Sequence, residues 1–230
     1  MEHLIEAGLA RMEEYPELLR TFLADLRSKN EKGKKIEPWK EDQLNRFGQV
    51  LADNARELKR AFTEGNISKT AWVARNFLEL SVWVRYCNLS DENGKNFRLD
   101  GARDLIGLFE AFKTLYFEQI KNDLDGMQQA TQEMEAIAQN EFGASSLGKK
   151  YLRVDKAAGM VGETKFESFN KLFSKYAHPT AWVVASVHYE EYTQFAAMFL
   201  LEGTFQANKA LEAMRNFVLS FYPAAQTQVP

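Results

Sequence analysis

The sequence contains only one cysteine, Cys87, among its 230 residues. A single cysteine excludes a disulfide within the chain, and it excludes a structural zinc site of the usual multi-cysteine kind. Proline is also scarce, with five residues in all and none between Trp39 and His178. Since proline is the strongest helix breaker, long helices are permitted across most of the chain.

Long hydrophobic runs and a secretory signal are missing as well. The first residues, Met-Glu-His-Leu-Ile-Glu, are acidic and amphipathic and lack the basic start and apolar core of a signal peptide. No stretch reaches the roughly 18 consecutive apolar residues of a membrane-spanning helix. We therefore expect a cytoplasmic protein with no membrane partner.

Neither sign of charge is in large excess: 29 Lys and Arg stand against 32 Asp and Glu, for a net charge of -3. This balance excludes a strongly basic nucleic-acid binder. A local basic patch leaves a nucleic-acid partner open without favouring it. Hydrophobic residues make up 45% and charged residues 27% of the chain, fractions typical of a folded globular protein.

What the sequence does have is apolar residues at intervals of three and four, without runs of alternating β-branched residues. This spacing predicts an all-α protein. The predicted helices cover residues 3–14, 16–28, 40–64, 68–88, 100–121, 123–141, 151–161, 164–177, 179–201 and 203–221. The run Asp-Glu-Asn-Gly at 91–94 is predicted to form a turn, and Asp100 to cap the next helix.

These helices are expected to form a multi-helix bundle of the up-and-down type. Residues 1–38 are predicted to form an N-terminal helical arm with a basic connector, because lysines concentrate between Ser28 and Lys40. Residues 39–222 form the main bundle, and residues 223–230 a frayed tail. The helices at 68–88 and 179–201 are expected to be central.

The predicted helix at 68–88 is the most informative segment for function. Apolar residues occur all around it, so it should be buried. Arg75 and Glu79 stand four residues apart on one face, bracketed by Trp72 and Val82. Because an unpaired buried charge is costly, we expect them to pair with each other or with polar groups nearby. They either fix the helix register or line a polar pocket, where a guanidinium suits a carboxylate or phosphate.

The segment from Ser174 to Trp182, Ser-Lys-Tyr-Ala-His-Pro-Thr-Ala-Trp, is the second candidate site. Proline disfavours the helical conformation in the residue before it, so His178 should lie at a break between two helices. A neutral imidazole beside a helix N-terminus has the chemistry of a general base. Alternatively, His178 caps the following helix and packs on Trp182. Tyr176 and Trp182 are further candidates for binding a ligand.

The spacing of the histidines and the residues around the glycine–lysine pairs exclude the familiar metal and nucleotide sites. His178 and His188 are ten residues apart, a rise of about 15 Å along a helix, which is too far for one ion. No glutamate stands three residues before a histidine of this pair, as di-iron bundles require. The glycine–lysine pairs are followed by Lys or Asn, so no P-loop is present. We expect neither a metal nor a cofactor.

The order of these features resembles a loose group of mostly microbial all-helical proteins, with Arg-x-x-x-Glu on an early buried helix and Ser-x-Tyr-x-His-Pro late in the chain. Here the motifs are Arg75 with Glu79, and Ser174 with Tyr176 and His178, and the resemblance covers residues 68–200. That group is distantly similar to the HEPN (higher eukaryotes and prokaryotes nucleotide-binding) superfamily. This superfamily comprises helical bundles and includes ribonucleases of defence and toxin systems.

The HEPN nuclease signature places an arginine four to six residues ahead of the histidine, and this chain departs from it. The corresponding positions before His178 hold Lys171, Leu172 and Phe173. Only Lys171 can supply a positive charge there. The resemblance therefore implies the bundle fold more than the reaction.

Three function hypotheses follow. The primary prediction is a binding or interaction module, in which Arg75, Glu79 and His178 form a polar pocket for a small anionic ligand or a segment of a partner protein. The second is a HEPN-like, metal-independent nuclease or nucleotide-processing enzyme, with His178 as general base and Arg75 or Lys171 stabilising phosphate charge. The third is a helical scaffold for oligomerisation. Homo-oligomers are open under all three.

Overall fold

The computed structural model describes residues 1–120, 152–178 and 191–223, with six isolated positions between residues 126 and 140. Its helices are α1 (Glu2–Gly33), α2 (Pro38–Thr63), α3 (Ile67–Leu89), α4 (Asp91–Ile120), α6 (Val154–Met160), α7 (Phe166–Ala177) and α9 (Glu191–Phe221). These described residues form no strand, which confirms the all-α prediction. Nearly all of the predicted helix at 123–141, residues 179–190 and the tail from 224 onward lie outside the described residues.

The first helix is longer than predicted. α1 runs without a break through Pro16, where the sequence predicts two separate helices. Its buried residues continue at helical spacing across the proline: Met12, Tyr15, Leu19, Phe22 and Leu26. Their packing holds both halves on one axis despite the backbone hydrogen bond that a proline removes. α1 also takes in the first lysines of the predicted connector, so that only residues 34–37 separate it from α2.

α1 belongs to the same core as the helices that follow it. The hydroxyl of the fully buried Tyr15 donates to the carbonyl of Ala207 in α9. Its ring meets Phe77 of α3 edge-on, with 6.3 Å between ring centroids. Burial raises the pKa of this phenol well above its usual range. Residues 1–33 therefore pack into the bundle and do not stand apart as an arm.

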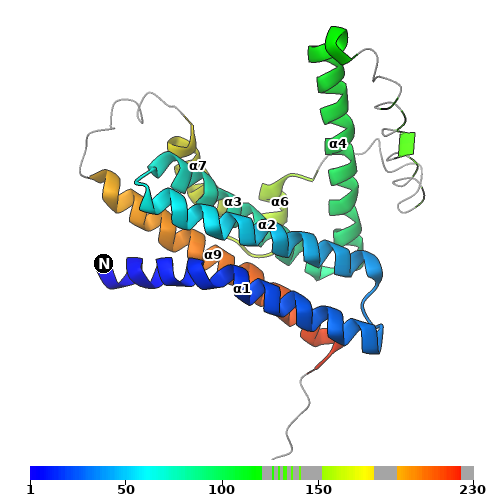
Figure 1. Cartoon of the computed structure of the whole chain (residues 1–230), viewed down its shortest axis with the longest axis horizontal. Helices are drawn as coiled ribbons and strands as arrows, with labels where there is room; N and C mark the ends of the chain where they lie inside the picture. The colour runs from blue at the N-terminus through cyan, green and yellow to red at the C-terminus, as the bar shows by residue number, and fades with distance from the viewer. Residues whose placement is uncertain are drawn as a thin grey trace, which may run out of the picture.

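α3 is central, as expected, and it contacts α2, α4, α6, α7 and α9 (Figure 1). α9 lies along α3 and continues through Gly203, so the break predicted between 201 and 203 is wrong. A Cβ atom at Gly203 would lie 2.7 Å from Leu58 and 3.4 Å from Ala74 of α3. The glycine therefore permits close packing of two helices and does not end one.

α4 begins at Asp91, so the predicted turn at 91–94 and the predicted cap at Asp100 are wrong. A Cβ atom at Gly94 would lie 3.0 Å from the ring of Trp39, which shows that this glycine serves packing against α2. Further along α4, Leu108 and Leu115 are 50% and 72% exposed. Figure 1 shows the later part of α4 rising away from the other helices.

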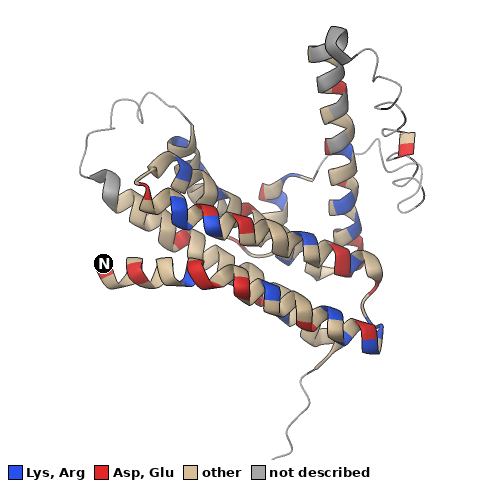
Figure 2. Cartoon of the chain, in the orientation of Figure 1, with Lys and Arg blue, Asp and Glu red and all other residues tan. Residues whose placement is uncertain are grey.

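Charge is mixed over the surface. Figure 2 shows Lys and Arg interspersed with Asp and Glu along α1, α2 and α4. None of the helices in the described part of the chain is long and apolar enough to cross a membrane.

Candidate functional site

One side of α3 stays open to solvent although its other sides are covered. Residues at helical spacing form this side, which we call the α3 stripe: Trp72, Arg75, Asn76, Glu79, Leu80 and Trp83. Trp72 is 47% exposed and the other five are half-buried. The six residues that alternate with them between 73 and 82 are all buried. The stripe is therefore a continuous surface that runs along the central helix.

The stripe lies on the side of α3 that faces away from α9. Ala74, which meets Gly203, and Ser81, whose hydroxyl donates to Gln206 Oε1 at 2.6 Å, mark the α9 side. At 100° per residue, the stripe points about 180° from these two positions. Asn76 bounds it toward α2, where its amide donates to Asn54 Oδ1 at 3.1 Å.

Arg75 and Glu79 pair with each other, which confirms the expectation from their spacing. Arg75 Nε donates to Glu79 Oε1 at 2.9 Å, and the side chains are 29% and 30% exposed. A guanidinium has five N–H donors, and this bond uses one. The pair is thus held in place on the helix while water, or a ligand, reaches both groups.

Two indole rings mark the ends of the stripe. They stand eleven residues apart, which is about 16 Å along a helix. Trp83 packs against Phe97 of α4 and Tyr86, with centroid distances of 5.1 and 5.9 Å. Trp72 was expected to be buried, and this prediction is wrong. Apolar residues occur on every side of the helix, and such a pattern does not show which side lacks a neighbouring helix.

The other predicted site residues lie on or near α7. His178 ends α7 in an extended conformation, with φ -111° and ψ 149°, as the following proline predicts, and it is exposed. Lys171 is exposed as well. Tyr176 is buried, with its ring 5.2 Å from Phe195 and 4.8 Å from Phe199, so it forms part of the core.

Trp182 lies outside the described residues. Within the described chain, no hydrogen bond or ion pair joins His178 to Arg75 or Glu79. The pocket built from all three therefore stays a prediction.

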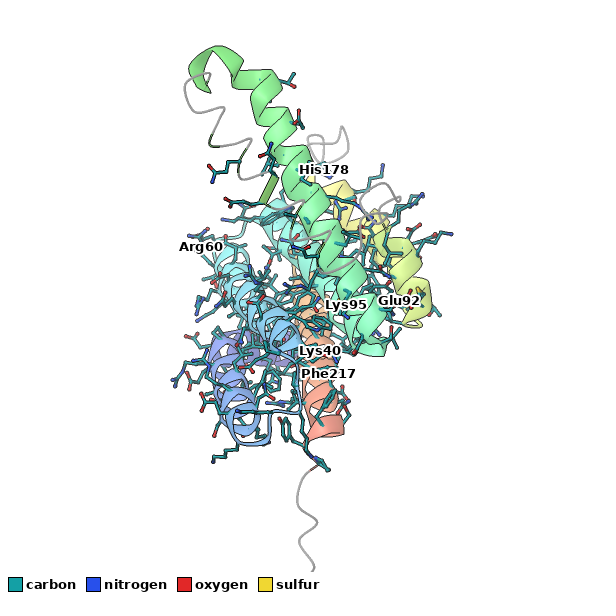
Figure 3. All side chains as sticks on the ribbon, turned by 90° about the vertical axis from the view of Figure 1, so that its right-hand side faces the viewer. Lys40, Arg60, Glu92, Lys95, His178 and Phe217 are labelled. Carbon is teal, nitrogen blue, oxygen red and sulfur yellow. The ribbon has the colours of Figure 1, made fainter. Side chains whose placement is uncertain are left out.

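The hollows described next lie elsewhere in the described chain. A groove of about 650 Å³ runs between α1 and α2, and another of about 510 Å³ runs between α1 and α9. A space of about 10 Å³ beside Lys40 and Phe217 has room for about one water molecule (Figure 3). None of these three is lined by Arg75, Glu79 or His178.

An ionic cluster of half-buried side chains, which the sequence did not predict, lies where α3, α9 and the α6–α7 turn meet. Arg85 Nη2 donates to Glu163 Oε2 at 2.7 Å, and Lys209 Nζ binds the same oxygen. The side chains of Arg85, Glu163 and Lys209 are 18%, 9% and 25% exposed. One carboxylate thus ties the turn to two helices.

The pKa values of Glu163 and of Glu202 in α9, whose charges interact, shift in opposite directions. Burial alone would raise the pKa of Glu163, but the hydrogen bonds and charges of Lys209 and Arg85 outweigh it and hold that pKa below its usual value. Burial raises the pKa of Glu202, and the charge of Glu163 adds to this against a hydrogen bond from Gln206. Since Arg85, Glu163 and Lys209 are one another's partners, we assign this cluster to stability.

No family model, curated protein or solved structure matches the chain. Over the described residues, no three His, Cys, Asp or Glu side chains come together to hold a metal ion. Cys87 is buried, and burial raises the pKa of its thiol far above the usual value, so it remains a neutral core residue. We therefore infer a function from the α3 stripe.

Proposed function

We propose that the protein is a binding module that recognises a segment of a partner protein through the α3 stripe. The observation that carries the proposal is the presence of two tryptophans and an arginine on the one open side of the central helix. Tryptophan and arginine are among the residues most enriched at binding hot spots. Large apolar side chains grouped on a surface also mark interaction sites in soluble proteins.

The dimensions favour a protein segment over a small molecule. The stripe is about 16 Å long and lies on the surface, whereas small-molecule sites are concave and enclose most of the ligand. A nucleic acid is less suitable, because the stripe offers one cation, Arg75, which is already paired with Glu79. Binding to a phosphate backbone needs several unpaired cations.

Four side chains of the stripe have distinct tasks in this proposal. Trp83 is already held by Phe97 and Tyr86, so it loses little freedom when a partner covers it. Trp72 supplies the larger exposed apolar area. Glu79 orients the guanidinium of Arg75, whose remaining donors bind a carboxylate or carbonyl groups of the partner.

Site-specific photo-cross-linking in cells of the source organism tests this function. Benzoylphenylalanine at position 72 is expected to capture a protein that mass spectrometry identifies. The same residue at position 50 of α2, where Val50 is 45% exposed, should not capture it. The purified partner is then titrated against wild-type and variant chains.

We expect Arg75→Glu and Trp72→Ala to weaken binding of that partner at least about 10-fold, as hot-spot residues do. Arg46→Glu is the matched control, because Arg46 also pairs with an acid one turn away, Asp42, at 2.9 Å. A partner that binds both stripe variants as tightly as the wild type contradicts the proposal.

A further inference from the structure

We propose that the end of α9 is a clasp that closes the α1–α2 connector and can open while the rest of the bundle stays folded. The clasp consists of Phe221 and Tyr222, and the connector is residues 34–37. The two segments come from opposite ends of the chain and meet beside the end of α1 (Figure 1). None of these residues belongs to the α3 stripe, so this inference goes beyond the proposed function.

The hydroxyl of Tyr222 holds two parts of the chain at once. It donates to Asn30 Oδ1 of α1 at 2.8 Å, and it accepts the backbone N–H of Lys35 at 2.9 Å. The ammonium of Lys35 reaches back to the clasp, where Nζ donates to the carbonyl of Phe221 at 3.1 Å. The same nitrogen lies 5.5 Å from the centre of the Tyr222 ring. Backbone and side-chain contacts therefore join the connector to the end of α9.

Asn30, which is buried, extends this contact to the rest of the connector. Its oxygen also accepts the backbone N–H of Ile36 at 2.9 Å. Its nitrogen donates to the carbonyl of Ile36 at 2.9 Å and to Glu41 Oε2 at 2.5 Å. A side-chain amide has two donors and an oxygen with two lone pairs, so these bonds and that of Tyr222 use its full capacity. Loss of the Tyr222 bond therefore weakens the amide that holds Ile36.

Gly33, the last residue of α1, leaves room for the Tyr222 ring. A Cβ atom at position 33 would lie 2.6 Å from Tyr222 Cε1, well inside the optimal separation of about 3.5–4.0 Å between carbon atoms. Alanine at this position therefore displaces the ring, although alanine favours a helix more than glycine does. The clasp can thus be opened by a substitution on either side of the contact.

Few buried side chains hold this end of the molecule. The last buried residue of α9 in the described chain is Val218, and residues 219–223 are exposed or half-buried. Of residues 31–38, Ile36 alone is buried. Regions with few buried apolar contacts open at a lower cost in free energy than the core does. The clasp should therefore open without unfolding of the helices that pack on α3.

Hydrogen exchange of single backbone amides in the full-length chain, followed by NMR, tests the inference. The amide of Ile36 is the reporter, because its hydrogen bond is to Asn30 and not to Tyr222. We expect Tyr222→Phe and Gly33→Ala each to accelerate its exchange at least about 5-fold, through loss of the Tyr222 hydrogen bond. Ser220→Ala is the matched control, because the Ser220 hydroxyl bonds within α9, and it should leave this exchange unchanged.

Exchange of the wild type in dilute urea separates local opening from global unfolding. The exchange rate of Ile36 should stay constant well below the unfolding midpoint, because local opening exposes little surface. That of Leu211, in the buried part of α9, should rise with urea. Equal urea dependence at both residues, unchanged exchange of Ile36 in either variant, or a change confined to the amide of Lys35 overturns the inference. Each of these results leaves the proposed function intact, since the α3 stripe takes no part in the clasp.

Discussion

Two arginines of α3 pair with glutamates, and the two pairs differ in the position of the glutamate in the fold and in its exposure to water. Arg75 pairs with Glu79 one turn along the same helix, and both are about 30% exposed. Arg85 pairs with Glu163, which is 78 residues away in sequence and 9% exposed. The first pair needs only a helix, whereas the second exists only in the folded bundle.

Under the proposed function, this difference separates binding from stability along one helix. An exposed pair one turn apart contributes about 0.3–0.5 kcal/mol to stability, so its sequence is free to serve recognition. Removing one partner of a buried pair costs several kcal/mol, because the remaining charge is left without a counter-ion. The predictions below test this division, from the largest expected effect to the smallest.

Glu163→Ala should cause the largest loss of stability. We expect the free energy of unfolding to fall by about 2–3 kcal/mol, somewhat less than for a fully buried pair because water reaches part of Arg85 and Lys209. Urea unfolding measures this change. Asp53→Ala, which removes the exposed partner of Arg56, should change stability by less than about 0.5 kcal/mol. Equal effects of the two substitutions would remove the distinction.

Glu202→Gln should raise stability at neutral pH by a smaller amount. The folded-state pKa of Glu202 lies above its usual value near 4.5, chiefly because of burial. The stability linked to this raised pKa is fully present below pH 4.5 and is lost as pH rises through the folded-state pKa. The glutamine cannot ionise, so its advantage over the wild type should appear above that pKa and vanish below pH 4.5. Unfolding at several pH values checks this, and a variant less stable at pH 7 refutes it.

Glu79→Ala should change stability by less than about 0.5 kcal/mol, because its partner Arg75 is 29% exposed and water replaces the lost contact. Thermal and urea unfolding at low protein concentration give this value. A loss as large as that of Glu163→Ala would show that the open pair is structural.

His178→Ala should have no measurable effect on RNA. Purified wild-type and variant chains are incubated with labelled single-stranded RNA and analysed by electrophoresis. We expect the same background from both, since no described residue pairs with the exposed His178. Cleavage by the wild type that is lost in the variant would instead support the nuclease hypothesis.

The helical fold and several helix boundaries were predictable from the spacing of apolar residues. The helices at 40–64, 68–88 and 164–177 were placed within two residues of α2, α3 and α7. The errors occurred at residues that usually end helices. Pro16, Gly94 and Gly203 all lie inside helices, and the two glycines are there because a neighbouring helix leaves no room for a Cβ atom. The helix propensity of a residue carries no information about such contacts between helices.

The candidate site was predictable where its partners are local. Arg75 and Glu79 are four residues apart, so their pairing follows from helix geometry alone. Arg85 meets Glu163 and Lys209 through tertiary packing, and no spacing in the sequence points to that cluster. A charge on an apolar helix, such as Arg85, was the one available signal that a distant counter-ion exists.

The urea midpoints of two arginine variants test most directly whether α3 assigns stability to Arg85 and not to Arg75. We predict that Arg75→Ala has a midpoint close to that of the wild type, because its pair with Glu79 is open to water. Arg85→Ala should have a clearly lower midpoint, because it takes one counter-ion from Glu163. An Arg75→Ala chain that is as unstable as Arg85→Ala would contradict the division.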